Sequence, residues 1–242
     1  MKAQIGGILG FSTLDYPGRP CSVVFMGGCP FRCPFCQNPE LIGITEVCKE
    51  MESRKVIELI MENKRVVDAI VFTGGEPLVQ VEALAEMLQL AKKENFLTKL
   101  DTNGFYPEKI VKILDLLDYV AIDVKTSLDP DKYSKAIGQP IGEKAIENLR
   151  RSIELVRNSG VRLELRTTVV PGLVGESDIR NICKELKPKK YYLQQFRPDK
   201  TLDPDYGKLR MTPDEELEKL AKIAKDSGAK EVWIRGGTLV RT

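Results

Sequence analysis

The sequence contains no histidine among its 242 residues. This absence excludes Ser-His-Asp and Cys-His catalysis, because both need an imidazole as the general base. It also excludes zinc sites of the His-containing and HExxH types. Any metal ion that binds to this chain must therefore be held by sulfur or oxygen ligands.

Long apolar runs and a strong excess of charge are absent as well. Apolar stretches such as DAIVFTGG and DYVAIDV span a few residues, whereas a membrane-spanning helix needs about 20. The formal net charge is +2, and the one modest basic cluster, CKELKPKK, is typical of a solvated helix end. The N-terminus has an early Gly-Gly and loop-type residues, unlike a signal peptide. We expect a cytoplasmic protein that binds neither a membrane nor nucleic acid.

Short apolar runs alternate with amphipathic stretches along the chain. Apolar residues recur at helical spacing between the runs, as they do at Val81, Leu84, Ala85 and Leu88. This alternation predicts an α/β fold with a parallel sheet, in the form of an open partial (β/α)6 barrel with outer helices. A flat doubly wound sheet is the alternative. We expect a single domain over residues 1–242. The predicted strands are residues 22–28, 69–75, 97–104, 119–125, 161–172 and 190–196.

The last predicted helix has recognisable start and stop signals. Thr212 is the expected N-cap, Pro213 the first helical residue, and Glu215 the partner that completes a capping box. Gly228 is expected to end this helix. A final strand is predicted in EVWIRGG, over residues 231–237.

Glycine-rich and polar segments follow the first four predicted strands. They read GGCPFRCPFC, TGGEP, DTNG and DVKTS in chain order. In either of the two folds, the carboxyl ends of parallel strands meet on one face, and this face carries the functional site. The four segments therefore predict a single site at that face.

Three cysteines with the spacing C-x3-C-x2-C lie in the segment CPFRCPFC, at Cys29, Cys33 and Cys36. A proline after each of the first two disfavours a helix and predicts an extended loop. A cubane iron–sulfur cluster takes four cysteine ligands, so three thiolates leave one iron without a protein ligand. By analogy with catalytic zinc, such an open coordination position is where a substrate binds. Two alternatives remain: zinc with Cys21 or Cys48 as the fourth ligand, and a thiol redox pair of Cys33 with Cys36.

The cysteine pattern, with Phe35 before the last cysteine, resembles the radical S-adenosylmethionine (SAM) superfamily. Four further segments sharpen the likeness and resemble the enzymes that activate glycyl-radical enzymes, above all the activases of anaerobic ribonucleotide reductase and pyruvate formate-lyase. The likeness extends over about residues 5–200. These segments are QNPEL (37–41), TGGEPL (73–78), DTNGF (101–105) and DVK (123–125).

The resemblance implies a 4Fe-4S cluster held by Cys29, Cys33 and Cys36, with SAM bound to the open iron. One electron from the reduced cluster would cleave the sulfonium into methionine and a 5′-deoxyadenosyl radical. That radical would remove a hydrogen atom from a glycine of the partner enzyme, with anaerobic ribonucleotide reductase as the expected partner. A flavodoxin or a ferredoxin-like protein would supply the electron. The cluster and SAM perform the chemistry, so no side chain is expected to be a catalytic group.

Two other functions remain open at this point. A radical SAM enzyme that acts on a small molecule would share the cluster motif. A protein module without enzymatic activity would bind zinc through the same cysteines. No second cysteine-rich segment occurs, so no auxiliary cluster is predicted, and Cys183 is interpreted as a core residue.

The residues expected beside SAM follow from the strand ends and from the resemblance. Glycines in TGGEP permit close approach to the backbone, and Glu76 or nearby carbonyls would accept from the ligand's ammonium group, although an ordinary turn would also explain this segment. The expected contacts are Phe35, Cys36, Gln37, Gly74, Gly75, Glu76, Asp101, Asp123, Val124, Lys125, Thr126, Arg166 and Gln195.

Several of these contacts have structural alternatives. Asp123 and Lys125 share one side of a strand end, where they would meet the ligand or form a solvent-facing ion pair. Arg166 would face the ligand carboxylate or pair with Glu164 or another acid. Some relatives carry a histidine near the nucleoside, and Gln195 or Phe196 is the candidate replacement here. Asp101 is given a supporting role, and Asn103-Gly104 is interpreted as a turn.

Overall fold

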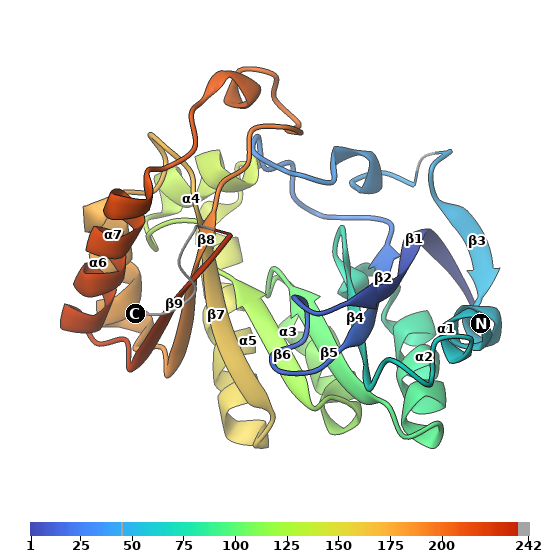
Figure 1. Cartoon of the computed structure of the whole chain (residues 1–242). Coiled ribbons are helices and arrows are strands. Elements are labelled where there is room, and N and C mark those ends of the chain that lie inside the picture. Colours follow the sequence, from blue (N-terminus) through green and yellow to red (C-terminus); the bar gives the residue numbers. More distant parts are fainter. Residues whose placement is uncertain (45, 237–242) are drawn as a thin grey trace. The chain divides into compact units, whose positions relative to one another are not determined.

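The computed structural model describes residues 1–44 and 46–236 (Figure 1). Its strands are β1 (Lys2–Ser12), β2 (Cys21–Met26), β3 (Lys49–Glu52), β4 (Ala69–Gly74), β5 (Leu97–Thr102), β6 (Tyr119–Asp123), β7 (Arg162–Val169), β8 (Lys190–Gln195) and β9 (Glu231–Arg235). Its α-helices are α1 (Ser53–Met61), α2 (Val81–Lys93), α3 (Pro107–Ile110), α4 (Pro130–Ile137), α5 (Gly142–Ser159), α6 (Glu176–Leu186) and α7 (Asp214–Asp226). Short 3-10 segments are η1 (Pro39–Leu41), η2 (Pro77–Gln80), η3 (Val111–Leu116) and η4 (Tyr206–Lys208).

The described residues form two compact units. The first unit comprises Met1–Pro30, Glu40–Ala121 and Ser152–Arg162. The second comprises Phe31–Pro39, Ile122–Arg151 and the described residues from Leu163 onward. The predicted single domain over residues 1–242 stays a prediction. Across the described residues, no helix combines the length and the apolar character that a membrane crossing requires.

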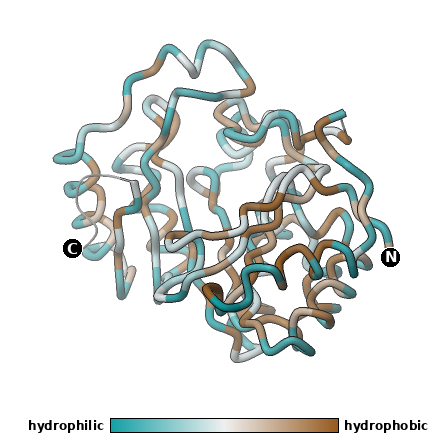
Figure 2. Tube along the Cα trace, turned by 45° about the vertical axis from the view of Figure 1, so that its right-hand side comes forward, coloured by the Kyte–Doolittle hydropathy of each residue, from teal (hydrophilic) through white to brown (hydrophobic). Residues whose placement is uncertain are grey.

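In the first unit the strands follow the order β3-β1-β2-β4-β5, with the first residues of β6 next to β5. β2, β4 and β5 run parallel, and their register places Val23 opposite Val71 and Ala69 opposite Leu97. α1 packs against α2, and α2 contacts β5. The predicted βα alternation is therefore present in this unit. Figure 2 shows the apolar and polar residues that alternate along such helices.

β1 corrects the expectation that the N-terminus is loop. It pairs antiparallel with β2 on one side and, through Lys2 to Ile5, with β3 on the other. Glycines at positions 6, 7 and 10 hide this strand from a pattern search, because glycine is depleted in strands. Gly6 has a packing reason, since a Cβ there would overlap the side chain of Leu41.

The interior of the first unit is filled by small and aromatic side chains from several strands. Tyr16, in the loop between β1 and β2, is fully buried there, and its hydroxyl accepts a hydrogen bond from Arg162 at 2.6 Å. Its ring contacts that of Tyr119, with the centroids 5.8 Å apart. The loop therefore packs as part of the core. The cluster consists of Tyr16, Cys21, Val23, Ala69, Val71 and Tyr119.

In the second unit the last residues of β6 are followed in order by β7, β8 and β9, and these three strands are parallel. Leu165, Tyr191 and Val232 are buried at matching register positions, and Tyr191 lies near Cys183 of α6. This face of the sheet therefore packs against the helices. The adjacent positions, among them Arg166 and Tyr192, lie on the opposite face.

The start of α7 differs from the prediction. Pro213, and not Thr212, occupies the N-cap position, and no side chain caps this helix. The Thr212 hydroxyl instead donates to the Val169 carbonyl at 3.1 Å, so it ties the helix start to β7. Gly228 follows the helix with a φ of 115°, as expected for a helix end. The predicted last strand is β9, and Gly237 at its predicted end lies outside the described residues.

Candidate functional site

The carboxylate of Glu76 joins two of the predicted site segments in the first unit. It is fully buried. One oxygen accepts from the Thr102 hydroxyl at 2.8 Å and from the Leu78 N–H at 3.1 Å, while the other accepts from the Asn103 N–H at 2.7 Å. Both oxygens thus have partners inside the protein. The side chain of Glu76 therefore fixes the end of β5, which leaves backbone carbonyls as the better candidates for a ligand's ammonium group.

The glycines of TGGEP have a structural reason within this unit. Gly74 has a φ of 119°, and a Cβ there would overlap the Met26 backbone. A Cβ on Gly75 would overlap the carbonyl oxygen of Gly28. The Glu76 N–H donates to that same carbonyl at 2.7 Å. The backbone that follows β2 can therefore approach the TGGEP segment only because both positions are glycine. The two glycines thus place the Cys29 loop against TGGEP.

Asn103 connects the DTNG turn to the first cysteine. Its side-chain Nδ2 lies 3.9 Å from the Sγ of Cys29, to which it donates. Its Oδ1 accepts from the Phe105 N–H at 3.0 Å, so the predicted turn is present. Burial first, and then the charges of Glu76 and Cys29, raise the pKa of Tyr106 in the same loop. Spacing alone did not reveal the contact between Asn103 and Cys29, because the two residues are far apart in the chain.

Asp101 is paired with a buried lysine on its own strand. Lys99 is fully buried in β5, and its Nζ lies 2.7 Å from the Asp101 Oδ1. The same ammonium donates to the Asp15 carbonyl at 2.7 Å. Asp101 is therefore held by a charge from within the protein, which agrees with the supporting role expected of it.

In the second unit the loop of Cys33 and Cys36 is anchored by its backbone. The Cys36 N–H donates to the Cys33 carbonyl at 3.0 Å, which closes a turn. The Arg32 N–H donates to the Ile137 carbonyl at 2.8 Å, at the end of α4. A Cβ on Gly138 would overlap the Arg32 carbonyl. The loop therefore requires glycine at the end of α4.

Two neighbours of Cys36 hold the same loop to residues 197–206. The ring of Phe35 is buried, with its centroid 6.4 Å from that of Tyr206. The Gln37 side chain donates to the Arg197 carbonyl at 3.3 Å. Both predicted site residues are therefore in contact with this later segment of the second unit.

Asp123, Lys125 and Arg166 form an ion-pair network in the second unit. The Arg166 Nε lies 2.8 Å from one oxygen of Asp123, and the Lys125 Nζ lies 3.0 Å from the other. Burial raises the pKa of Asp123, but the charges of Arg166 and Lys125 outweigh it and hold the pKa well below its usual range. Arg166 thus pairs with Asp123, and an oxygen of Glu164 lies 3.6 Å from the guanidinium of Arg235. The carboxylate stays ionised, and the network keeps one net positive charge.

Three other predicted contacts have protein partners. Val124 is buried, and its carbonyl accepts from the Thr167 hydroxyl at 2.9 Å. The Thr126 hydroxyl donates to the Leu173 carbonyl at 3.2 Å. Gln195 donates from Nε2 to the Thr212 carbonyl at 2.8 Å, and its buried Oε1 has no hydrogen-bond partner among the described residues. Neighbouring side chains of a strand point to opposite faces of the sheet. Gln194 lies on the same face as Arg166, so Gln195 lies on the opposite face.

The remaining cysteines differ in their distance from the triad. Cys21 begins β2 and Cys29 follows its end, so about 20 Å of strand separates them and excludes Cys21 as a common ligand. Burial raises the pKa of Cys183 to about 12, in keeping with a core residue. The Cys48 thiol fills the space that a Cβ on Gly27 would need. Of the two cysteines considered as a fourth zinc ligand, Cys48 is therefore the one that remains.

The donor set fits a cluster that binds soft thiolate ligands. The six cysteines, all of which lie in the described part of the chain, form no disulfide with one another. Burial raises the pKa of Cys33 to about 11 against the lowering charge of Lys125, so only a strong positive charge, such as that of bound iron, would keep this thiol ionised. Among the residues that the structure describes, no three Cys, Asp or Glu side chains surround a common metal position. The assignment of Cys29, Cys33 and Cys36 as ligands therefore rests on the chemistry of their thiols.

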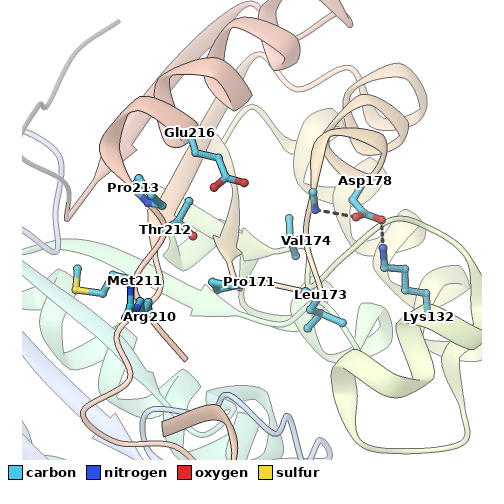
Figure 3. A pocket seen from close by; sticks show the side chains of 12 residues that line it. Lys132, Pro171, Leu173, Val174, Asp178, Arg210, Met211, Thr212, Pro213 and Glu216 are labelled. Atoms are coloured by element: carbon cyan, nitrogen blue, oxygen red, sulfur yellow. Dashed lines mark hydrogen bonds and ion pairs between the residues drawn. The ribbon is translucent and has the colours of Figure 1, made fainter. Parts of the chain in front are cut away.

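A cavity of about 600 Å³ lies in the second unit, at the carboxyl end of β7 (Figure 3). Asp178 faces it and is held by Lys132 at 2.6 Å and by the Gly175 N–H at 2.9 Å. None of the predicted site residues lines this cavity. Its lining consists of Lys132, Pro171, Gly172, Leu173, Val174, Gly175, Asp178, Arg210, Met211, Thr212, Pro213 and Glu216.

Comparisons with known proteins agree with the motif order. The family model of the radical SAM superfamily matches residues 23–186. A Methanocaldococcus jannaschii protein, provisionally named a glycyl-radical enzyme activating enzyme, is 39% identical over 93% of each chain. The pyruvate formate-lyase-activating enzyme of Clostridium pasteurianum is 30% identical over 93% of this chain and 97% of its own. A radical SAM methyltransferase from Sphaerobacter thermophilus shares the fold, with a TM-score of 0.64, 19% identity, and coverage of 92% and 68% of the two chains.

Proposed function

Because the chain belongs to the radical SAM superfamily, we propose that it activates a glycyl-radical enzyme and that this partner is anaerobic ribonucleotide reductase. The predicted superfamily, the α/β fold class of a partial barrel, the enzyme class and the two cofactors are confirmed by the family match and by the relatives. The named partner goes beyond them. When bound, the 4Fe-4S cluster and SAM supply the radical that takes a hydrogen atom from a glycine of the partner.

One observation carries the proposal most directly. In the first unit, Glu76 binds the Asn103 N–H at 2.7 Å, and Asn103 donates to Cys29. These contacts join the TGGEP, DTNG and cysteine segments, which the sequence places far apart. An ordinary βα turn would not need a fully buried carboxylate, because burying a charge is costly unless it is hydrogen-bonded. The geometry thus supports a shared role for the three segments.

The residues of this chain would bind and orient the cofactors. We assign Cys29, Cys33 and Cys36 as the cluster ligands. The backbone carbonyls at Gly74 and Gly75 would accept from the ammonium group of SAM, since the Glu76 side chain is already engaged. The net positive network of Asp123, Lys125 and Arg166 would attract the carboxylate of SAM.

The remaining contacts are assigned by their place beside these segments. Phe35 and Gln37 would hold the cysteine loop at the cofactor. Val124 and Thr126 would shape the backbone around Lys125, with Asp101 in support. The buried Oε1 of Gln195, which meets no hydrogen-bond donor within residues 1–44 and 46–236, is a suitable acceptor for an amino group such as that of adenine. We propose further that a flavodoxin or ferredoxin-like protein is the electron donor and that the protein acts in the cytoplasm.

The test is anaerobic reconstitution of the whole chain followed by incubation with SAM and a strong reductant. We expect about four irons per chain with matching sulfide, and formation of 5′-deoxyadenosine. Added anaerobic ribonucleotide reductase should acquire a glycyl radical, detected by electron paramagnetic resonance. Cleavage of SAM without a radical on any glycyl-radical protein would favour a small-molecule substrate. Stoichiometric zinc without sulfide would contradict the enzyme altogether.

A further inference from the structure

We propose that Asn103 is a positioning residue that acts through Cys29, and that its side-chain N–H raises the reduction potential of the cluster. The inference rests on the proposed function, because it assumes that Cys29 is a ligand. It goes beyond that function by giving a role to a residue that the sequence alone explains as part of a turn. Asn103 is buried, with 7% of its surface exposed.

The orientation of the Asn103 amide is fixed by its other contact. The Phe105 N–H can only donate, so the atom that it meets at 3.0 Å must be the side-chain oxygen. The NH₂ group therefore faces the Sγ of Cys29, at 3.9 Å. The Phe105 N–H thus distinguishes the oxygen from the nitrogen of the Asn103 side chain.

The backbone around Asn103 is held on both sides. Its own N–H donates to Glu76 at 2.7 Å. The next residue, Gly104, has a φ of 73°, donates to the Thr102 hydroxyl at 3.1 Å, and accepts from the Ser152 hydroxyl at 2.8 Å. Cys29 is fixed in turn, because its N–H donates to the Ile42 carbonyl at 3.0 Å. The donor and the sulfur are thus both preorganised.

The effect on the cluster follows from charge. Reduction adds one electron, and part of the added negative charge resides on the cysteine sulfurs. A hydrogen-bond donor at a sulfur stabilises the more negative state, so it raises the potential. Loss of the donor should make the cluster harder to reduce. The protein would then use Asn103 to bring the cluster within reach of its electron donor.

The experiment is an electron paramagnetic resonance titration of the reconstituted full chain and of two variants. Asn103→Ser keeps an oxygen that can accept from the Phe105 N–H but lacks the amide donor. Asn103→Asp keeps the acceptor and places a negative charge at the sulfur. For Asn103→Ser we expect about a tenfold smaller equilibrium constant for reduction, equivalent to about 59 mV for one electron. Asn103→Asp should shift the potential further in the same direction.

The matched control is Asn95→Asp, which makes the same change in charge at the opposite end of β5. Asn95 is exposed and lies about 20 Å away along the strand. It should leave the potential unchanged. Asn95 has a φ of 60°, which aspartate tolerates. A shift in this control as large as that of Asn103→Asp would show a general charge effect and overturn the proposal.

Two further outcomes decide the matter. If the equilibrium constants for reduction of both Asn103 variants lie within about threefold of the wild-type value, the inference is overturned. Folded variants, verified by thermal unfolding, that fail to hold a cluster would also overturn it, because a donor at one sulfur alters a potential but is not a ligand. If the wild-type chain itself holds no cluster, the proposed function fails. A wild-type cluster whose potential ignores Asn103 contradicts this inference alone.

Discussion

Two carboxylates of the predicted site are held in opposite ways. Glu76, in the first unit, is fully buried and accepts hydrogen bonds from the Thr102 hydroxyl and from two backbone N–H groups. Asp123, in the second unit, is more exposed and lies between the cations of Arg166 and Lys125. The first carboxylate thus lies among hydrogen-bond donors of the backbone and of a hydroxyl, whereas the second belongs to a group with a net positive charge.

This difference separates two tasks. A carboxylate whose oxygens are satisfied by fixed backbone groups cannot turn toward a ligand without breaking the turn that it supports, so Glu76 organises the protein. Long side chains with charged ends can exchange one partner for another, so Asp123, Lys125 and Arg166 are suited to meet a charged ligand. The following substitutions test this division, from the largest expected effect to the smallest.

Glu76→Gln should have the largest effect on stability. The substitution keeps the size of the side chain but points an NH₂ group at donors that need an acceptor. We expect a loss of about 3 kcal/mol in the free energy of unfolding, measured with urea on the protein without cofactors. Glu82→Gln is the control, because the Glu82 side chain is exposed at the start of α2 and should change the stability by less than about 0.5 kcal/mol. Equal effects of the two substitutions would refute the organising role of Glu76.

Gly75→Ala should cost about 2 kcal/mol in unfolding free energy, since the new Cβ overlaps the Gly28 carbonyl and the backbone must shift. The comparison is Gly172→Ala in the second unit, where φ is 78° and, its two chain neighbours aside, no heavy atom of the described residues lies within 4 Å of the new Cβ. There we expect about 1 kcal/mol, from the backbone conformation alone. A smaller cost at Gly75 than at Gly172 would contradict the close approach of the two segments.

Arg166→Met should lower stability by about 1.5 kcal/mol, because it removes a hydrogen bond to a charged group at a partly exposed site. Arg166→Met should also raise the KM for SAM at least tenfold. Glu76→Gln, in contrast, should raise this KM only because it destabilises the protein. The control is Arg150→Met, whose partner Glu185 lies on the surface, with an expected cost below about 1 kcal/mol. An unchanged KM would remove Arg166 from the cofactor site.

The pH dependence should be the smallest effect. The pKa of Asp123 is lower in the folded than in the unfolded chain, so its stabilisation is present above the unfolded value of about 4 and is lost as the pH falls below it. Arg166→Met removes the strongest lowering cause and raises the folded pKa. Urea unfolding between about pH 6 and pH 3 should therefore show a shallower acid loss in the variant than in the wild type. A steeper loss would contradict the ion-pair network.

The regular part of the fold could be predicted from the sequence because its signals are local. The pattern in residues 119–125 identified β6, and the helical spacing from Val81 to Leu88 identified α2. β1 was missed, since its glycines serve contacts with distant residues such as Leu41. Thr212 was misassigned because its hydroxyl has a better acceptor in Val169, which no local pattern reveals.

The candidate site shows the same division. The cysteine spacing and the glycine segments could be recognised in the sequence, and the family match agrees with them. The contact of Asn103 with Cys29 and the bonds from Thr102 to Glu76 join residues from different strand ends. Such contacts depend on how the strands are placed side by side. They therefore appear only once the chain is folded.

The central claim is that Cys29, Cys33 and Cys36 alone hold a 4Fe-4S cluster. Iron and sulfide should be counted in six anaerobically reconstituted variants, each with one cysteine replaced by alanine. Cys21→Ala, Cys48→Ala and Cys183→Ala should keep about four irons and four sulfides per chain, as the wild type does. Each of the other three variants should lose most of both. Full iron content in Cys29→Ala, or its loss in Cys48→Ala, would contradict the three-cysteine site.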